Sequence, residues 1–90
     1  EFLRREEGFL SLHISSHDTT HVIMGKMLNE INIPRGCLVA LLKRGATTII
    51  PNGDTLLQDQ DRLTIIGDSK SLNEFRNRFT AKKKRRKNKD

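Results

Sequence analysis

Apolar and polar positions alternate early in the chain. In residues 9–15, FLSLHIS, every second residue is Leu or Ile and most of the others are Ser or His. This period of two predicts a strand with one buried face. Residues 37–44, CLVALLKR, begin with six apolar residues in a row, which predicts a central strand covered on both sides.

Two further strands are predicted after it. Arg44 and Gly45 form a turn, and residues 47–51, TTIIP, read as the hairpin partner of 37–44, with Pro51 ending the ladder. The sequence NGD at 52–54 is a strong turn signal. Residues 62–67, RLTIIG, supply the fourth strand.

Two segments have helical spacing. In residues 22–31, Ile23, Met27 and Ile31 recur at i, i+4 and i+8, which predicts an amphipathic helix that ends before Pro34. A last helix is predicted after Asp68 or Ser69, either of which can cap it. Its apolar face consists of Leu72, Phe75 and Phe79.

The predicted order is strand, helix, strand, strand, strand, helix, which is an α+β fold on a small, mostly antiparallel sheet. A chain of 90 residues with 34% hydrophobic residues and no Trp or Tyr builds a small core, so we expect a dimer. The predicted domain covers residues 8–79. Residues 1–7 are interpreted as a linker or the remnant of a longer or processed chain, and 80–90 as a disordered basic tail.

The net charge of +6 comes from the end of the chain. Residues 82–90 hold seven of the 17 basic residues and one of the 11 acidic ones, which leaves ten of each in residues 1–81. The rest of the chain therefore has no net charge to attract phosphate. The basic residues of the tail are Lys82, Lys83, Lys84, Arg85, Arg86, Lys87 and Lys89.

Three histidines, His13, His17 and His21, are spaced by four residues. On one helix they could share a face and bind zinc, but His13 falls in a predicted strand and the following SSHDTT has the composition of a cap and turn, with Asp18 and Thr20 as candidate N-caps. We therefore predict no metal site here.

Other functional classes have little support in the sequence. There is no Gly-rich phosphate loop and no nucleophile with a base, so the chain is not predicted to be an enzyme. Asp54, Asp59 and Asp61 read as a solvated turn and lack the glycine and the regular alternation of a calcium loop. A single cysteine weakly favours a reducing compartment, and no apolar run is long enough to span a membrane.

Residues 25–67 resemble the TrkA C-terminal domain, also called the C-terminal RCK domain, and with flanking elements the likeness covers residues 8–79. The matching features are a Gly-Lys-Thr-Leu-like start, a Pro and a Gly before the second strand, an Arg-Gly turn, an Ile-Pro-x-Gly-Asp-Thr stretch and an Asp opening the last strand. They correspond to Gly25, Lys26, Leu28, Pro34, Gly36, Arg44, Gly45, Ile50, Pro51, Gly53, Asp54, Thr55 and Asp61. Met27 departs from the usual Thr, and Gln60 from the common Gly.

The resemblance implies a cytoplasmic regulatory domain, at the inner face of the cell membrane, of a potassium/proton or other cation antiporter or channel. It also implies a homodimer that senses a small ligand or ion and contacts a transmembrane transporter portion of the same or a partner polypeptide. The ligand or dimer contact is expected at Gly25, Lys26, Leu28, Asn32, Ile33, Pro34, Arg35, Gly36 and Leu38.

Cyclic di-AMP or another nucleotide is the candidate ligand, and no cofactor is established. Members that bind cyclic di-AMP tend to carry an Arg in the loop after the first helix and an Asn early in the second strand. This chain has Asn32 and Leu38 there; Arg35 could replace the Arg, but nothing replaces the Asn.

The alternative function is an anionic-surface or nucleic-acid binding module that acts through the basic tail. In a membrane-associated protein, this cluster would favour anionic lipid headgroups. Base-specific reading of nucleic acid is disfavoured, because no aromatic residue accompanies the basic run. A purely solubilising tail remains the third interpretation.

Overall fold

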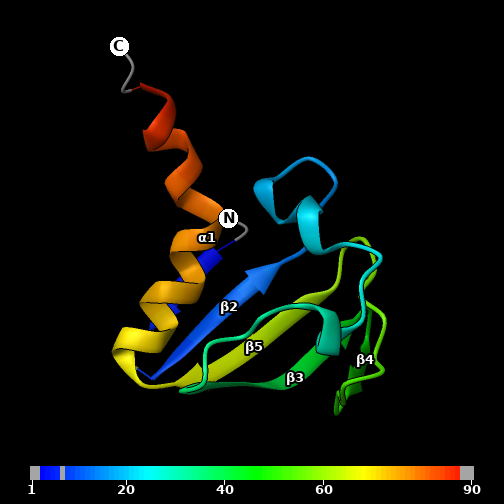
Figure 1. Cartoon of the computed structure of the whole chain (residues 1–90). Helices are drawn as coiled ribbons and strands as arrows, with labels where there is room; N and C mark the ends of the chain where they lie inside the picture. Colours follow the sequence, from blue (N-terminus) through cyan, green and yellow to red (C-terminus); the bar gives the residue numbers. More distant parts are fainter. Residues whose placement is uncertain (1–2, 7, 88–90) are drawn as a thin grey trace.

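The computed structural model describes residues 3–6 and 8–87, with side chains described for residues 8–80. A five-stranded antiparallel sheet has the strand order β1-β2-β5-β3-β4, and a long helix, α1, lies against one face of it (Figure 1). The elements are β1 Leu3–Glu6, β2 Phe9–His13, η1 Thr19–Ile23, η2 Leu28–Glu30, β3 Cys37–Arg44, β4 Thr47–Ile49, β5 Arg62–Gly67 and α1 Ser69–Lys87, where η marks a short 3₁₀ helix.

The α+β class and the four expected strands are confirmed, and the structure adds a fifth strand. β1 pairs with β2 through a turn at Gly8, whose positive φ of 84° suits glycine. β1 falls inside residues 1–7, which were interpreted as a linker. The sequence pattern missed it because three of its four residues are charged, so apolar and polar positions do not alternate. Residues 1, 2 and 7 of that segment lie outside the described ones.

The hydrophobic core lies between the sheet and α1. Leu10 and Leu12 of β2 and Leu63 and Ile65 of β5 have almost no exposed surface, as the period of two predicts. The helix contributes the three apolar residues expected from its spacing, and two of them stack edge to face with ring centroids 5.4 Å apart. These helix residues are Leu72, Phe75 and Phe79.

The predicted helix at 22–31 is wrong. Two 3₁₀ turns, η1 and η2, replace it, with Gly25 between them at a φ of 82°. Local hydrogen bonds here span only three residues, and other backbone groups bond to residues 53–57: the N–H groups of Gly25 and Leu28 donate to the carbonyls of Leu57 and Thr55, at 2.9 and 3.0 Å. The apolar spacing that suggested a helix belongs instead to an irregular segment, which still buries Ile23, Leu28 and Ile31.

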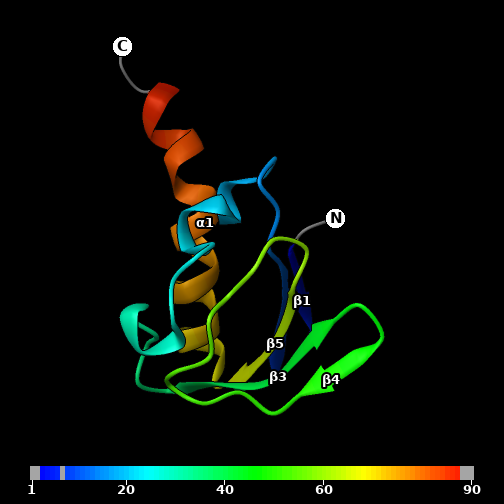
Figure 2. The same ribbon diagram turned by 90° about the vertical axis from the view of Figure 1, so that its right-hand side faces the viewer.

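The sheet is covered on one face only. Figure 2 shows α1 and the two 3₁₀ turns on the same side of the sheet, and no described helix lies on the other side. The prediction that residues 37–44 are covered on both sides is therefore wrong for this chain. Leu38 of β3 is 58% exposed, and Ile66, its neighbour on β5, is 41% exposed.

Helix α1 begins at the predicted cap. Asp68 Oδ1 accepts a hydrogen bond from the backbone N–H of Ser71 at 2.8 Å. Two glycines let the start of β3 and the end of β5 approach this cap closely. A Cβ on Gly36 would overlap with Asp68 Oδ2 and Ser71 Oγ. A Cβ on Gly67 would overlap with the carbonyl oxygen of Gly36.

The helix also continues beyond its apolar face. It extends to Lys87, through most of the run expected to be disordered. Lys and Arg are good helix formers, and cations are favourable near a helix C-terminus, so the helix does not need an apolar face to continue there. Lys89 lies outside the described residues.

Candidate functional site

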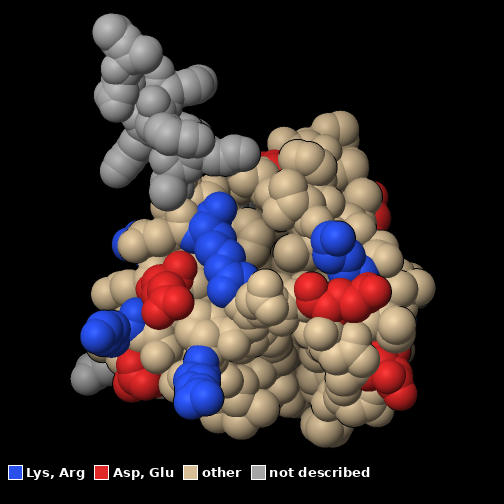
Figure 3. Space-filling view, viewed as in Figure 1, with Lys and Arg blue, Asp and Glu red and all other residues tan. Residues whose placement is uncertain are grey.

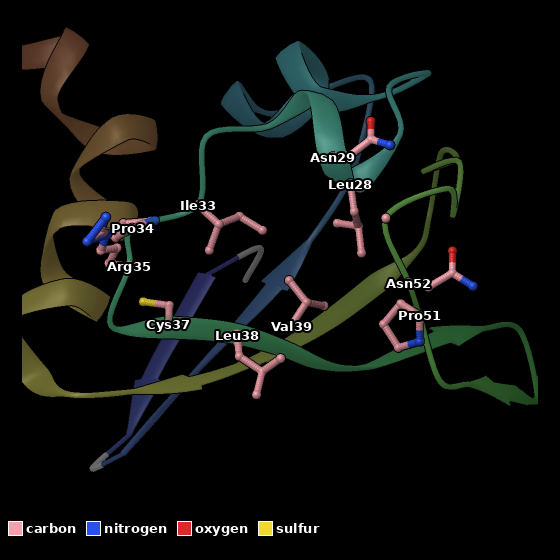
Figure 4. A pocket seen from close by; sticks show the side chains of 11 residues that line it. Leu28, Asn29, Ile33, Pro34, Arg35, Cys37, Leu38, Val39, Pro51 and Asn52 are labelled. Atoms are coloured by element: carbon pink, nitrogen blue, oxygen red, sulfur yellow. The ribbon is translucent and has the colours of Figure 1, made fainter.

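A pocket of about 340 Å³ lies at the start of β3, between the loop 31–36, η2 and the turn at 51–53 (Figure 4). It is lined by Leu28, Asn29, Ile33, Pro34, Arg35, Cys37, Leu38, Val39, Pro51, Asn52 and Gly53. The figure shows Leu38 extending to the opposite side of β3 from Cys37 and Val39, so Leu38 belongs to the edge of the pocket rather than to its floor.

The loop 31–36 is held at both ends by the helix. The guanidinium of Arg78 donates a hydrogen bond to the carbonyl oxygen of Asn32, and the carbonyl oxygen of Gly36 accepts one from the backbone N–H of Asp68 at 3.3 Å. The Arg78 guanidinium also stacks over the ring of Phe75. A shift of α1 would therefore move this wall of the pocket.

The opposite wall is a tightly hydrogen-bonded turn. Asn52 Oδ1 accepts from the backbone N–H of Asp54 at 2.8 Å, and Thr55 Oγ1 accepts from the backbone N–H of Asn52 at 2.9 Å. The backbone N–H of Asn29 donates to the carbonyl oxygen of Gly53 at 2.9 Å, which joins η2 to the turn. The turn predicted at 52–54 is thus present, with Asn52 and Thr55 supplying its side-chain hydrogen bonds.

The polar groups of the pocket lie at its two ends. Figure 4 shows Arg35 at one end and the amides of Asn29 and Asn52 at the other, with apolar side chains between them. Arg35 is exposed and makes no hydrogen bond or ion pair within the described part of the chain. An apolar floor with one cation and two amides suits a small ligand that has a flat apolar part and an anionic group.

Cys37 is not activated as a nucleophile. Partial burial raises the pKa of its thiol, and the negative charges of Asp68 and Glu74 raise it further, against a smaller opposing effect of Arg78. The thiol therefore stays protonated near neutral pH and acts as a small apolar wall.

The described side chains on the face that carries α1 are not dominated by charge of one sign. Figure 3 shows basic and acidic side chains interspersed on the face seen in Figure 1. Attraction of an anionic ligand to the pocket therefore depends on local groups such as Arg35 rather than on the charge of the whole face.

A second polar cluster lies at the other end of β3. The carboxylate of Asp61 is fully buried and accepts two hydrogen bonds from Arg44, from Nε at 2.9 Å and from Nη2 at 2.8 Å. It also accepts one from the backbone N–H of Gln58 at 2.8 Å. This bidentate pair holds the pKa of Arg44 above its ordinary value.

The interpretation of Asp61 as part of a solvated turn is therefore wrong, whereas Asp54 and Asp59 are exposed as expected. Arg44 Nη2 donates to the carbonyl of Leu56 at 2.9 Å as well, so this side chain joins β3 to the loop before β5. The Arg and the Asp of the family-like pattern thus have a structural role, and Gly45 supplies the adjacent turn at a φ of 63°.

The site residues expected from the sequence fall into two groups. The first group lines the pocket and consists of Leu28, Ile33, Pro34, Arg35 and Leu38. The second group lies outside the pocket lining and consists of Gly25, Lys26, Asn32 and Gly36. The carbonyl oxygen of Lys26 accepts a hydrogen bond from the backbone N–H of Leu57, and Gly36 lies against the cap residue Asp68 and Ser71. Asn29, Cys37, Val39 and Asn52 were missed; of these, only Asn52 had a signal, as part of the turn sequence at 52–54.

The three histidines do not meet. His13 Nε2 lies 3.0 Å from Gln60 Oε1, and His21 Nδ1 lies 2.9 Å from the carbonyl oxygen of Asp18. No group of three metal-ligating side chains occurs in the described part of the chain. Thr20 is buried and not a cap: its Oγ1 accepts from the backbone N–H of Ser15 and donates to the carbonyl of His13.

Within residues 3–6 and 8–87, no helix is both long enough and apolar enough to cross a bilayer.

Comparison with known proteins gives consistent results. Residues 18–80 match the model of the TrkA-C domain family. A Trk system potassium uptake protein TrkA homolog 1 of Methanosarcina mazei is 37% identical over 57 residues, which are 63% of this chain and 13% of that protein. A TrkA homolog of Archaeoglobus fulgidus is 29% identical over 65 residues, 72% of this chain and 14% of that protein. The chain thus spans about one seventh of the length of these relatives.

A solved structure described as an RCK domain with cda has the same fold. It superimposes with a TM-score of 0.62 at 19% identity and covers 76% of this chain and 91% of its own.

Proposed function

The chain belongs to the TrkA-C domain family, and from that premise we propose that it is the regulatory domain of a potassium transport system. The relatives it matches are potassium uptake proteins, and the matched segment is a small part of each. In this proposal the domain carries out no reaction. It works at the cytoplasmic face of the membrane, where its state controls an attached or associated transmembrane transporter, such as a cation antiporter or channel.

The pocket at the start of β3 is the observation that carries the proposal. It combines apolar walls with two amides at one end and, at the other, a cation that has no partner among the described residues, and it lies where loop, turn and helix cap meet. The candidate ligand is a nucleotide, because its base can pack on the apolar floor while its phosphate faces Arg35. Cyclic di-AMP is the first to test, since the structural neighbour is described with cda, which denotes cyclic di-AMP.

We further propose that two copies pair over this pocket. Ile50, directly before the pocket residue Pro51, is 74% exposed, which leaves apolar surface beside the opening. A second copy would cover it and close the pocket from the open side. A ligand held between two copies can bias their arrangement only if it binds one arrangement better than another, and the shared wall near Arg78 and α1 is the part that could transmit the change.

The experiment is a calorimetric titration of cyclic di-AMP into the chain, with ADP as comparison. We expect one ligand per two chains and stabilisation of about 2.7 kcal/mol at 100 times the dissociation constant. Arg35→Gln should weaken binding, and Lys70→Gln, which removes an equal charge from α1 outside the pocket lining, should not. Absence of heat together with an unchanged melting temperature would reject the nucleotide, and a monomer by sedimentation at micromolar concentration would reject the pairing.

A second candidate function is attachment to an anionic membrane surface through the basic run. The observation that favours it is that α1 carries this run away from the sheet as a continuous helix to Lys87 (Figure 1). Each Lys or Arg near an anionic surface contributes about 1 kcal/mol. Deleting residues 82–90 should abolish binding to phosphatidylglycerol vesicles, and binding that survives the deletion would reject this role.

A further inference from the structure

The uncovered face of the sheet is organised in three rows that cross β2, β5 and β3. Strand register places His13, Arg62 and Lys43 side by side, and we call these three the basic row. Four residues back along β2, Phe9 lies beside Ile66 and Leu38, which form the apolar row. The middle row consists of Ser11, Thr64 and Leu41.

These rows face away from the core. Along each strand they alternate with residues buried on the opposite face, the one that carries α1, such as Leu12, Leu63 and Leu42. Arg62 and Lys43 are exposed, and neither makes a hydrogen bond or ion pair within residues 8–80. Asp59, in the loop that precedes Arg62, accepts instead from the backbone N–H of Ser16 and from Gln60 Nε2. The basic row is therefore uncompensated among the described side chains.

Such a row is unfavourable for the isolated fold. Like charges directly opposite each other on neighbouring strands destabilise a sheet, and Lys43 lies directly opposite Arg62. At the other end, Leu38 and Ile66 expose apolar surface beside each other. Two unfavourable features on one uncovered face are both relieved by a partner that brings carboxylates to one row and apolar groups to the other.

The dimensions of the face match a helix. The basic and apolar rows are separated by four residues along β2 and β5, about 13 Å, and by five along β3, where the register shifts between Val39 and Leu41. An α-helix with its side chains is about 10–12 Å wide. Neighbouring strands are about 4.8 Å apart, so a row of three residues extends about 10 Å. Carboxylates at i, i+4 and i+7 of a helix that crosses the strands also extend about 10 Å along its axis.

We propose that the outer face of β2, β5 and β3 docks an amphipathic helix of a partner protein, with its acidic edge on the basic row and its apolar edge on the apolar row. The helix lies across the strands above the middle row, in which Ser11 and Thr64 have small side chains and Leu41 adds apolar surface at the β3 side.

Other occupants fit the face less well. Two copies packed face to face would bring the basic rows together or place each basic row on an apolar one, and both arrangements are unfavourable. A flat bilayer requires apolar groups deeper than cations, but here both lie at the same level of one sheet. Single-stranded nucleic acid uses several stacking aromatic residues, and Phe9 is the one aromatic in the three rows.

The probe is a synthetic helical peptide of about five turns, labelled with fluorescein, that carries Leu along one edge and Glu at i, i+4 and i+7 along the other. A second peptide has Gln in place of each Glu, and a third has Lys. Fluorescence anisotropy gives the affinity for the chain, and amide chemical shifts in an NMR titration give the location.

We expect the Glu peptide to bind with an affinity that falls as salt is raised, and to shift amides of β2, β5 and β3. The Gln peptide should bind about tenfold more weakly, and the Lys peptide should not bind. Arg62→Gln and Lys43→Gln should each weaken binding about tenfold, whereas Lys70→Gln on α1 should leave it unchanged. Both row variants should unfold at the same temperature as the unmodified chain or at a higher one, which a structural role would not produce.

Several results would overturn the proposal. Equal affinity for the Glu and Lys peptides would show that the partner is not acidic. Amide shifts confined to α1 or to the pocket would show that the helix does not bind on this face. Absence of binding by all three peptides would reject the helix. Concentration-dependent shifts on this face without peptide would identify a second copy as its occupant, and binding to phosphatidylglycerol vesicles that Arg62→Gln abolishes would identify a membrane.

Discussion

The two ends of β3 use an arginine in opposite ways. At the end of the strand, Arg44 makes a bidentate ion pair with the fully buried Asp61, and the pair holds the loop before β5. Just before its start, Arg35 lines an open pocket and has no ion pair within the described residues. One end of the strand is therefore built for stability, and the other leaves a cation available to a ligand.

The difference lies in the surroundings of the two side chains. Arg44 faces a loop that supplies a carboxylate and a backbone carbonyl, so its guanidinium is satisfied within the fold. The loop at 31–36 bonds to α1 through backbone groups and Arg78, which leaves Arg35 free. We therefore expect substitutions at the first end to change the free energy of unfolding, and substitutions at Arg35 to change ligand binding.

The largest effect is expected for Asp61→Asn. It removes a buried charge that accepts three hydrogen bonds, and because an amide has one oxygen in place of two, Arg44 loses its charged partner and one acceptor. Breaking a buried ion pair costs about 3–5 kcal/mol. We expect about 3 kcal/mol for this pair, because the Arg44 side chain is 34% exposed. Urea unfolding followed by circular dichroism measures the loss.

Two control variants sharpen this result. Asp59→Asn changes an exposed neighbour and keeps the oxygen that accepts from Ser16, and Arg35→Gln changes the unpaired arginine. Each should shift the free energy of unfolding by less than about 0.5 kcal/mol. If Arg35→Gln destabilised the chain as much as Asp61→Asn, the contrast between the two ends would be wrong.

The second effect concerns the close packing at the pocket end. Gly36→Ala would place a methyl group into Asp68 Oδ2 and Ser71 Oγ, so the cap of α1 must shift. We expect a loss of about 2 kcal/mol in thermal or urea unfolding. Gly53→Ala is the matched control, because its added Cβ would meet Asn29 at 3.4 Å, an ordinary contact. Equal losses for both variants would show that the cap is not the cause.

The strands could be predicted from the sequence because burial on one face imposes a period of two. Residues 9–15 and 62–67 show that period at alternate positions, and these positions are the buried ones: Leu10, Leu12, Ile14, Leu63 and Ile65. The segment 22–31 failed because spacing alone does not show where its backbone bonds. The N–H groups of Gly25, Leu28 and Asn29 donate to carbonyls in residues 53–57, a tertiary contact between segments about 30 residues apart.

The candidate site was predictable only in part. The loop residues Ile33, Pro34 and Arg35 were expected, and they line the pocket. Val39 and Cys37 were missed because an apolar run gives no sign of which residues border a cavity. The burial of Asp61 was missed because its neighbours in the sequence are polar, and its partner Arg44 is 17 residues away.

A smaller effect, and of opposite sign, is expected beside the ion pair. Gln60 has a positive φ of 74°, a left-handed conformation that costs a residue with a side chain about 1 kcal/mol. Gln60→Gly removes this cost but loses the contact with His13, so we expect a net gain of about 0.5 kcal/mol in urea unfolding. Gln60→Ala keeps the strain and loses the contact, and should therefore destabilise. A loss with Gly equal to that with Ala would show that the backbone is not strained there.

The smallest expected effect is a dependence on pH at the pocket end. Hydrogen bonds from the backbone and then the side chain of Ser71, with Lys70 as a weaker influence, hold the pKa of Asp68 below its ordinary value of 3.8. Because the native pKa is lowered, the stabilising contribution of this cap is complete above pH 3.8 and is lost as the pH falls through the lower native value.

Asp68→Asn isolates that contribution, because Asn caps a helix as well as Asp but does not titrate in this range. The melting temperature of the unmodified chain should fall more steeply below pH 3.8 than that of the variant, and the two should run parallel above it. Parallel curves over the whole range would mean that the charge of Asp68 does not stabilise the cap. The cap would then hold the pocket wall at Gly36 through hydrogen-bond geometry alone, and Asp61 with Arg44 would be the one charged contact among the described side chains that stabilises β3.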